Sequence, residues 1–426
     1  MPAIGFDEAL RTILSSTRPV SSENVALAQA LGRIAAAAVI ADEDAVPFPR
    51  SAMDGYAVRS SECVGATPDN PVQLPVAGQV FAEEGHATLA PGTAVSIMTG
   101  APIPRGADAV IPHERTELQG ASVRISVPVV PGDCVFPPGE DFHRGDELIA
   151  KGEALNAGKL ALLAFAGKPA VRVFRRPRVA IVCTGNELVD PASKPAYGQV
   201  RNSNAVALSA LVLAAGGEPR YEGVARDTRA ALVEILQRAR SGADLVITTG
   251  GASAGKRDLV KSTLTELGAE FHFKQVAMRP GKPVGFAEWD GIPVCVLPGN
   301  PAAGFVCFQK LVRPALARLS GSSAVGLPVL QARLDADLHG RPGRRYFVLA
   351  RLHREPKGFV VKPVANQCSA LVRTAADANA IITVHETTSE SKASLRRGEM
   401  VDVEVLDWSS VFTASRERVS AEVVAA

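Results

Sequence analysis

The stretch Leu245-Val-Ile-Thr-Thr-Gly-Gly-Ala-Ser-Ala-Gly-Lys-Arg-Asp258 runs from a short apolar segment into a glycine-rich one, and a helical pattern follows it. A strand, a glycine turn and a helix form the repeating unit of a parallel α/β sheet. Glycines let backbone N–H groups approach an anion at the positive end of a helix. We therefore expect a phosphate or another oxyanion to bind here, with contacts from Gly250, Gly251, Ser253 and Gly255. The alternative is a turn whose glycines serve only tight strand–helix packing.

The same segment approaches the spacing of a P-loop, because four residues separate Gly250 from Gly255 and Lys256. Arg257 occupies the position at which a Ser or Thr hydroxyl would bind Mg2+. The sequence therefore does not support a true P-loop, and a nucleotide hydrolase or adenylyltransferase stays open only as an alternative function.

Strand-like and helix-like patterns alternate on both sides of this segment, from Arg178 to about Gly321. This alternation predicts a doubly wound, mostly parallel sheet with helices on both faces. Ligands of such folds bind beyond the carboxyl ends of the strands. The expected strands are 179–183, 221–224, 245–248, 271–276, 284–287 and 294–297, and the expected helices are 203–215, 228–239, 258–267 and 302–319.

The flanking sequence predicts further domains. Short Val/Ile-rich runs cut by Pro and Gly indicate a β-domain inserted into a helical linker domain. Helical spacing of apolar residues in that linker predicts helices over 6–14 and 22–31. The expected units are the linker (1–45 and 140–172), the inserted β-domain (46–139), the α/β domain (173–322), a small barrel-like C-terminal β-domain (326–408) and a tail (409–426).

Three carboxylates follow three consecutive strands of the predicted sheet. Glu187 comes after the first strand, Asp227 after the second, and Asp258 after the glycine-rich turn. Carboxylates gathered at the carboxyl edge of such a sheet can hold Mg2+, which bridges phosphate oxygens. We therefore expect these three residues to converge. Taken singly, each acid could instead cap a helix or lie in a solvated turn.

Two proline-containing turns lie at neighbouring strand ends. Arg279-Pro-Gly-Lys-Pro283 presents the cations Arg279 and Lys282, which suit a multiply charged anion. Pro298-Gly-Asn-Pro301 could cap the following helix through Asn300. The alternative is that both are ordinary solvated turns.

Polar residues also recur in the inserted segment. Asp54 lies in Ser-Ala-Met-Asp-Gly-Tyr, Thr99 in Met-Thr-Gly-Ala-Pro, and Asp141 ends Pro-Gly-Glu-Asp. An Asp-Gly pair can equally form a hairpin turn, so the residues alone leave the role of this group open.

Composition limits the classes of function. The 46 basic and 44 acidic side chains give a formal net charge of +2, which offers no general attraction for nucleic acid or anionic lipid. The apolar runs are shorter than the roughly 18 residues of a membrane helix, and Asp7 and Glu8 replace the basic start of a secretory signal. The cytoplasm is therefore the expected compartment.

Six scattered cysteines without a CxxC pair indicate reduced, mostly buried thiols, and the seven histidines show no zinc-site spacing.

Together, these motifs resemble the molybdopterin molybdenumtransferase (MoeA) family, which is related to the E-domain of gephyrin. The resemblance extends from about Phe6 to Trp408. The similar segments, in family order, are SAMDGYA (51–57), MTGAPIPRGADAV (98–110), PPGED (137–141), TGNEL (184–188), TTGGASAG (248–255) with Asp258, RPGKP (279–283) and PGNPAA (298–303).

The resemblance implies an enzyme that inserts molybdate into adenylylated molybdopterin and releases AMP in a Mg2+-dependent step. Glu187, Asp227 and Asp258 would be catalytic and would bind Mg2+, while Arg279 and Lys282 would attract molybdate. The substrate-binding set would also include Thr184, Gly250, Gly251, Ser253, Gly255, Pro298, Asn300, Pro301 and Ser369.

Family members work as elongated homodimers, so Asp54, as a further catalytic residue, with Thr99 and Asp141 would complete the site of the other subunit. A molybdopterin adenylyltransferase and recipient molybdoenzymes are the implied partners. The chain departs from the family pattern at Gln275, Ala303 and Leu349, positions that bear on molybdate contacts. A non-catalytic pterin-binding scaffold is therefore a further alternative.

Overall fold

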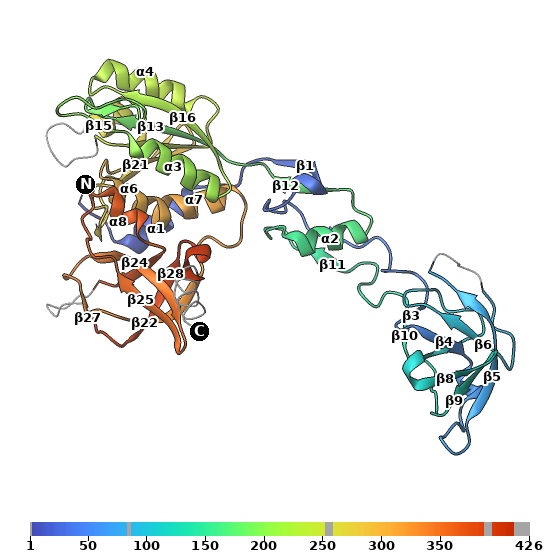
Figure 1. The fold of residues 1–426 in the computed structure, drawn as a ribbon. Coiled ribbons are helices and arrows are strands. Elements are labelled where there is room, and N and C mark those ends of the chain that lie inside the picture. Colours follow the sequence, from blue (N-terminus) through green and yellow to red (C-terminus); the bar gives the residue numbers. More distant parts are fainter. Residues whose placement is uncertain (1, 83–86, 252–258, 387–393, 413–426) are drawn as a thin grey trace.

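The computed structural model describes residues 2–82, 87–251, 259–386 and 394–412. These residues form an elongated molecule (Figure 1). An α/β domain and a C-terminal β-domain lie together at one end, and the inserted β-domain lies at the other. A narrow region of paired strands and one helix joins the two ends. The inserted domain is therefore distant from the α/β domain of its own chain.

The α/β domain contains a six-stranded sheet in the order β16-β13-β17-β21-β20-β18. The first four strands are parallel, and the last two are antiparallel additions. This arrangement confirms the predicted mostly parallel sheet. The bounds are Glu218–Ala225 (β16), Arg178–Thr184 (β13), Leu245–Thr249 (β17), Ile292–Leu297 (β21), Gly285–Trp289 (β20) and Glu270–Phe273 (β18).

Helices cover both faces of this sheet because side chains alternate along each strand. Val179 and Ile181 of β13 point into a core shared with α3 (Ser203–Ala214), α6 (Pro301–Cys307) and α7 (Arg313–Leu319). Ala180 and Val182 point into the opposite core, which α4 (Arg229–Arg240) and α5 (Leu259–Glu266) complete. The helix expected over 302–319 is two helices joined by a π-helical turn, Phe308–Val312.

The linker is less helical than its sequence predicts. The first helix is present as α1 (Phe6–Ser16), but the helix expected over 22–31 is wrong. That segment forms β1 (Ser22–Ala26), which pairs antiparallel with β12 (Ala170–Phe174), and a 3-10 turn follows. The partner strand is remote in sequence, so local periodicity could not reveal the pairing. The rest of the linker comprises β2 (Val39–Ile40), which pairs with β11 (Glu147–Ile149), and α2 (Ala157–Phe165).

Helix α1 belongs by its packing to the main body and not to the linker. Phe6, Ala9 and Ile13 are buried in the core shared by the α/β and C-terminal domains. The Phe6 ring meets Phe347 edge to face, with the ring centroids 4.9 Å apart. The start of the chain therefore joins these two domains.

The inserted β-domain is a six-stranded sheet in the order β7-β4-β6-β5-β9-β8, with the separate pair β3 and β10 beside it. Two small apolar cores lie within this domain. The bounds are Ala109–Pro112 (β7), Gly55–Val58 (β4), Ala94–Ile97 (β6), Val72–Val80 (β5), Ser122–Ile125 (β9), Thr116–Gln119 (β8), Arg50–Ser51 (β3) and Val135–Phe136 (β10).

The C-terminal domain is a closed barrel, as its predicted short strands suggested. Its strands follow the order β24-β25-β22-β28-β26, and β26 pairs back with β24. Closure removes the unpaired strand edges. The bounds are Arg345–Glu355 (β24), Gly358–Pro363 (β25), Val329–Leu334 (β22), Met400–Val405 (β28) and Ala380–Val384 (β26), and β19 (Met278–Arg279) adds to β24.

Arg345 at the start of β24 joins this barrel to α1. Its guanidinium donates to both Asp7 oxygens at 2.5 and 2.8 Å and to both Glu386 oxygens at 2.6 and 2.8 Å. Paired bonds of this kind are among the stronger polar contacts in proteins. The hydrogen bonds from Arg345 lower the pKa of Asp7 below its usual value. The folded state is thereby stabilised when Asp7 is ionised.

We expect this stabilisation to be lost in acid. Because the folded pKa of Asp7 lies below the unfolded value of about 4, the contribution is complete above that value and disappears as the pH falls through the folded pKa. The melting temperature of Asp7→Asn should be below that of the parent at pH 7, and the difference should shrink toward pH 3. Glu8→Gln, on the same helix but outside the ion pairs, is the control. An unchanged difference between pH 7 and pH 3 would contradict the assignment.

Candidate functional site

A cavity of about 940 Å³ lies at the carboxyl ends of β13, β17 and β21. This is the edge at which ligands bind in doubly wound folds. Its walls come from the loops after these strands, from the start of α3, and from a segment next to α8 (Val372–Ala376) of the C-terminal domain. Predicted site residues that line it are Thr184, Glu187, Asp227, Gly250, Gly251, Pro298, Asn300 and Pro301.

The glycine turn forms a close-packed floor on one side of this cavity. Gly250 has a φ of +95°, and a Cβ atom there would lie 2.3 Å from the Thr184 carbonyl oxygen. A Cβ atom on Gly299 would lie 3.2 Å from the Gly250 Cα atom. Residues without side chains thus let the three strand-end loops meet. Ser253, Gly255 and Asp258, which the sequence also assigns to this site, lie outside the described residues.

Hydrogen bonds hold these loops together. Thr249 donates its hydroxyl to the Pro298 carbonyl at 3.0 Å. The Asn204 amide donates to Thr249 Oγ1 at 3.1 Å and to the Gly299 carbonyl at 2.8 Å. By contrast, the buried Thr184 hydroxyl has no partner among the residues described. A buried hydroxyl without a partner is costly, so Thr184 is suited to bond with a ligand.

Glu187 and Asp227 are brought to the same cavity, as their positions in the sequence predict. The backbone N–H of Asp227 donates to Asn186 Oδ1 at 3.2 Å, which links the two acidic loops. Mg2+ commonly uses one or two carboxylates together with water and substrate phosphate oxygens. The two carboxylates are the donor type that such an ion takes, and the described ranges contain no group of three metal-binding side chains.

The predicted cationic turn lies beside the cavity. Pro283 lines it, whereas the side chains of Arg279 and Lys282 are exposed and are not among its lining residues. The Arg279 guanidinium stacks on Tyr346 with 5.9 Å to the ring centroid. Ser369 precedes Ala370 of the cavity lining, and its hydroxyl accepts a hydrogen bond from Asn300 at 3.4 Å.

A second polar group lies in the inserted domain. Asp54 Oδ1 accepts hydrogen bonds from the Thr99 hydroxyl at 2.7 Å and from the Thr99 backbone N–H at 2.6 Å. These bonds lower the pKa of the exposed Asp54 carboxyl. Asp141 is exposed in a bend where the chain returns to the linker, next to Phe142, which packs on the linker residues Ala41 and Ala166. Within one chain the structure separates these residues from the α/β cavity (Figure 1).

Sequence reasoning missed Arg201, Asn202 and Asn204, which line the cavity at the start of α3. Asn202 caps that helix by accepting from the Ala205 N–H at 3.1 Å. The run Arg-Asn-Ser-Asn at a predicted helix start was the available signal, because polar residues there face the carboxyl edge of the sheet.

The cysteines are free and mostly buried, as the sequence analysis predicts. All six cysteines are free, and four of them are buried. Burial raises the pKa of Cys183 to about 11, which leaves its thiol protonated and unreactive. In the described part of the chain, no helix has the length and apolar character needed to cross a membrane.

Comparisons with known proteins cover nearly the whole chain. Residues 4–167 match the MoeA N-terminal region (domain I and II), 180–318 a probable molybdopterin binding domain, and 331–406 the MoeA C-terminal region (domain IV). A molybdopterin molybdenumtransferase of Nostoc sp. is 39% identical over 78% of this chain and 77% of its own. One from Staphylococcus epidermidis is 33% identical over 96% of both chains. The crystal structure of a molybdopterin biosynthesis MoeA protein from Pyrococcus horikoshii superposes with a TM-score of 0.80 at 34% identity, covering 95% of this chain and all of that one.

Proposed function

This chain is an enzyme of the molybdopterin molybdenumtransferase (MoeA) family, and from that premise we propose that it inserts molybdenum from molybdate into adenylylated molybdopterin in a Mg2+-dependent step that releases AMP. The observation that carries the proposal is the 940 Å³ cavity, whose described residues combine a glycine floor, a buried hydroxyl without a partner among them, and two carboxylates. A phosphorylated substrate needs donors for its phosphates and a cation between them, and this edge of the sheet offers both.

Each part of the cavity has a place in this reaction. Backbone N–H groups of the loop at Gly250 and Gly251 would bind the pterin phosphate, and the Thr184 hydroxyl would donate to it. Glu187 and Asp227 would hold Mg2+ and orient the attacking water. Bound there, Mg2+ would neutralise charge on the phosphate oxygens. Water attack would break the phosphoanhydride bond, so that AMP leaves and the pterin retains its phosphate. The two dithiolene sulfurs would then bind the molybdenum of molybdate in place of one oxygen, which leaves as water with the two thiol protons. Arg279 and Lys282 would attract molybdate at the rim.

Purified protein should release AMP from adenylylated molybdopterin only when Mg2+ and molybdate are both present. Steady ATP turnover without the pterin would favour a nucleotide hydrolase or adenylyltransferase instead. Tight pterin binding without AMP release would favour a non-catalytic scaffold.

We further propose that the active unit is a homodimer in the cytoplasm, supplied by a molybdopterin adenylyltransferase and delivering product to recipient molybdoenzymes. Asp54, Thr99 and Asp141 of one subunit would then complete the cavity of the other. The support is their distance from the cavity of their own chain, together with the hydrogen-bonded Asp54–Thr99 pair exposed at the surface.

Mixed dimers test this shared site. Asp54→Asn and Glu187→Gln should each release AMP far more slowly than the parent when tested alone. After subunit exchange, about a quarter of the parent rate of AMP release should return, because half of the dimers are mixed and one of their two sites is intact. If each site belonged to one chain, mixing would restore nothing. Exchange of the parent with itself, followed by the same assay, controls for losses during mixing.

A further inference from the structure

A second cavity, of about 370 Å³, lies where the linker meets the α/β domain, on the side of the molecule away from the carboxyl edge. Its walls come from the linker, from the segment between β12 and β13, from the end of α3, and from α7 with the residues that follow it. Four arginines line it: Arg33, Arg175, Arg176 and Arg313. The reaction proposed above uses none of them.

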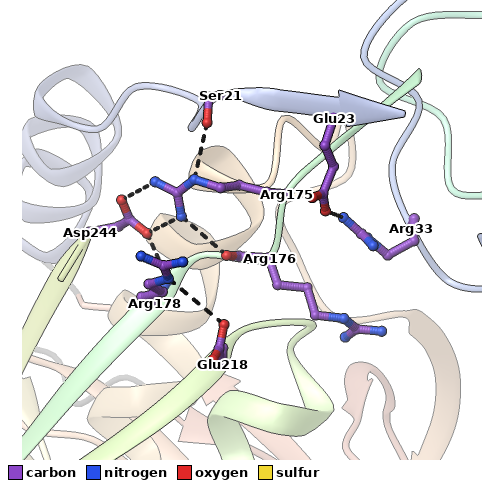
Figure 2. A network of polar contacts seen from close by, with 8 residues as sticks. All are labelled: Ser21, Glu23, Arg33, Arg175, Arg176, Arg178, Glu218 and Asp244. Atoms are coloured by element: carbon purple, nitrogen blue, oxygen red, sulfur yellow. Dashed lines mark hydrogen bonds and ion pairs between the residues drawn. The ribbon is translucent and has the colours of Figure 1, made fainter. Parts of the chain in front are cut away.

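Two of these arginines are already neutralised. Arg33 forms an ion pair with Glu23 and donates to the Phe174 carbonyl at 2.9 Å. Arg175 binds both carboxylate oxygens of Asp244, at 2.5 and 2.6 Å, and contacts Ser21 (Figure 2). The contacts of Arg175 with Ser21 and Asp244 hold the linker against the α/β domain, whereas the Arg33–Glu23 pair lies within the linker.

The other two arginines have no acidic partner within the described ranges. Figure 2 shows the Arg176 guanidinium turned away from the network, while its carbonyl accepts from Arg175. Arg313 at the start of α7 is half-buried, and burial lowers its pKa. A half-buried guanidinium without a counter-charge is unfavourable. The hydroxyl of Ser320, at the other end of α7, is also buried without a partner among the residues described.

The C-terminal end of a helix offers another explanation for the two arginines without acidic partners in the described residues. Helix α3 ends at the cavity near Ala215, and carbonyl groups at helix C-termini attract cations. However, neither Arg176 nor Arg313 donates a hydrogen bond to a carbonyl in the described structure. The helix end can lower the cost of placing the charges here, but it supplies no counter-charge: Arg176 is exposed to solvent, and Arg313 is half-buried without an acidic partner in the described residues.

We propose that this cavity binds a tetrahedral oxyanion, either free or as the phosphate of a small phosphomonoester, between Arg176, Arg313 and the Ser320 hydroxyl. Such an anion would satisfy the unpaired guanidinium groups and the buried hydroxyl together. The volume exceeds that of a bare oxyanion and accommodates a short organic group. Because residues from the linker and from the α/β domain line the cavity, the bound anion would also strengthen the junction between them.

Titration calorimetry on the full-length protein tests this site, with inorganic phosphate and glycerol phosphate as separate ligands at constant ionic strength. Arg313→Gln should weaken binding by about tenfold or more, since a charge-assisted hydrogen bond is lost. Ser320→Ala should weaken it less. Arg318→Gln, an exposed arginine of the same helix outside the cavity, should bind as the parent does. The tighter of the two ligands identifies the source of the oxyanion.

Thermal melting separates a binding role from a structural one. Without added anion, Arg313→Gln should melt no lower than the parent, because it removes an unpaired charge. Its phosphate-dependent rise in melting temperature should be smaller than that of the parent. Equal phosphate affinity in Arg313→Gln and Arg318→Gln, or a lower melting temperature of Arg313→Gln with an unchanged response to phosphate, would overturn the proposal. AMP release is not the readout, so failure here leaves the proposed reaction intact.

Discussion

Replacing Glu187 by Gln should reduce the rate of AMP release by roughly 100-fold or more at saturating Mg2+. The substitution keeps the shape of the side chain but removes one of the two carboxylates that line the cavity among the described residues. A bound cation contributes several kcal/mol of charge stabilisation to phosphoryl chemistry, and each 1.36 kcal/mol corresponds to a factor of ten in rate. Asp227→Asn should behave in the same way. Single-turnover measurement of AMP gives the chemical rate without product release.

The metal dependence distinguishes a magnesium ligand from a residue that only shapes the cavity. For Glu187→Gln, the Mg2+ concentration that gives half-maximal AMP release should rise, whereas a packing role would leave it unchanged. Glu234→Gln serves as the matched control, because Glu234 is an exposed acid of α4 with a side-chain exposure of 80%. Parent-like rates for Glu187→Gln together with Asp227→Asn would refute the assigned roles.

The sequence was most informative for the parallel strands, because they produce a clear local pattern and also position the residues of the candidate site. The strands of the α/β sheet are buried on both faces and read as short apolar runs, so their positions could be predicted. Chain direction then placed Glu187 and Asp227 at one edge, and the cavity brings them together. The linker strand β1 could not be predicted in this way, because its pairing with β12 depends on residues far along the chain.

The finer parts of the site depend on contacts between loops. Asn204 looks like an ordinary residue at a helix start until the loops after β17 and β21 supply its acceptors, Thr249 and Gly299. Likewise, Leu349, one of the positions at which the resemblance implies a departure from the family pattern, has its side chain buried in the main core. Its backbone is held by the Gln367 side chain, which accepts from the Leu349 N–H at 3.2 Å and donates to its carbonyl at 2.8 Å.

Gly250→Ala should destabilise the α/β domain more than an ordinary glycine substitution in a turn. Two costs act together: the φ of +95° disfavours a side chain, and the new Cβ would lie 2.3 Å from the Thr184 carbonyl oxygen. Backbone atoms cannot move aside as a flexible side chain can, so the loop after β13 or β17 must shift. We expect a loss of about 3 kcal/mol in the free energy of unfolding, from backbone strain and overpacking together.

Gly268→Ala isolates the steric part of this effect. Gly268 has nearly the same φ, +92°, but nothing lies within 4 Å of a Cβ placed there, so only backbone strain of about 1 kcal/mol is expected. Urea unfolding can be followed through Trp289, which is buried in the sheet, after Trp408→Phe removes the second tryptophan. Equal losses for the two alanine variants would mean that the loops do not depend on the Gly250–Thr184 contact. If the contact shapes the phosphate-binding floor, only Gly250→Ala should also weaken binding of the pterin substrate, because only there do the loops that line the cavity have to separate.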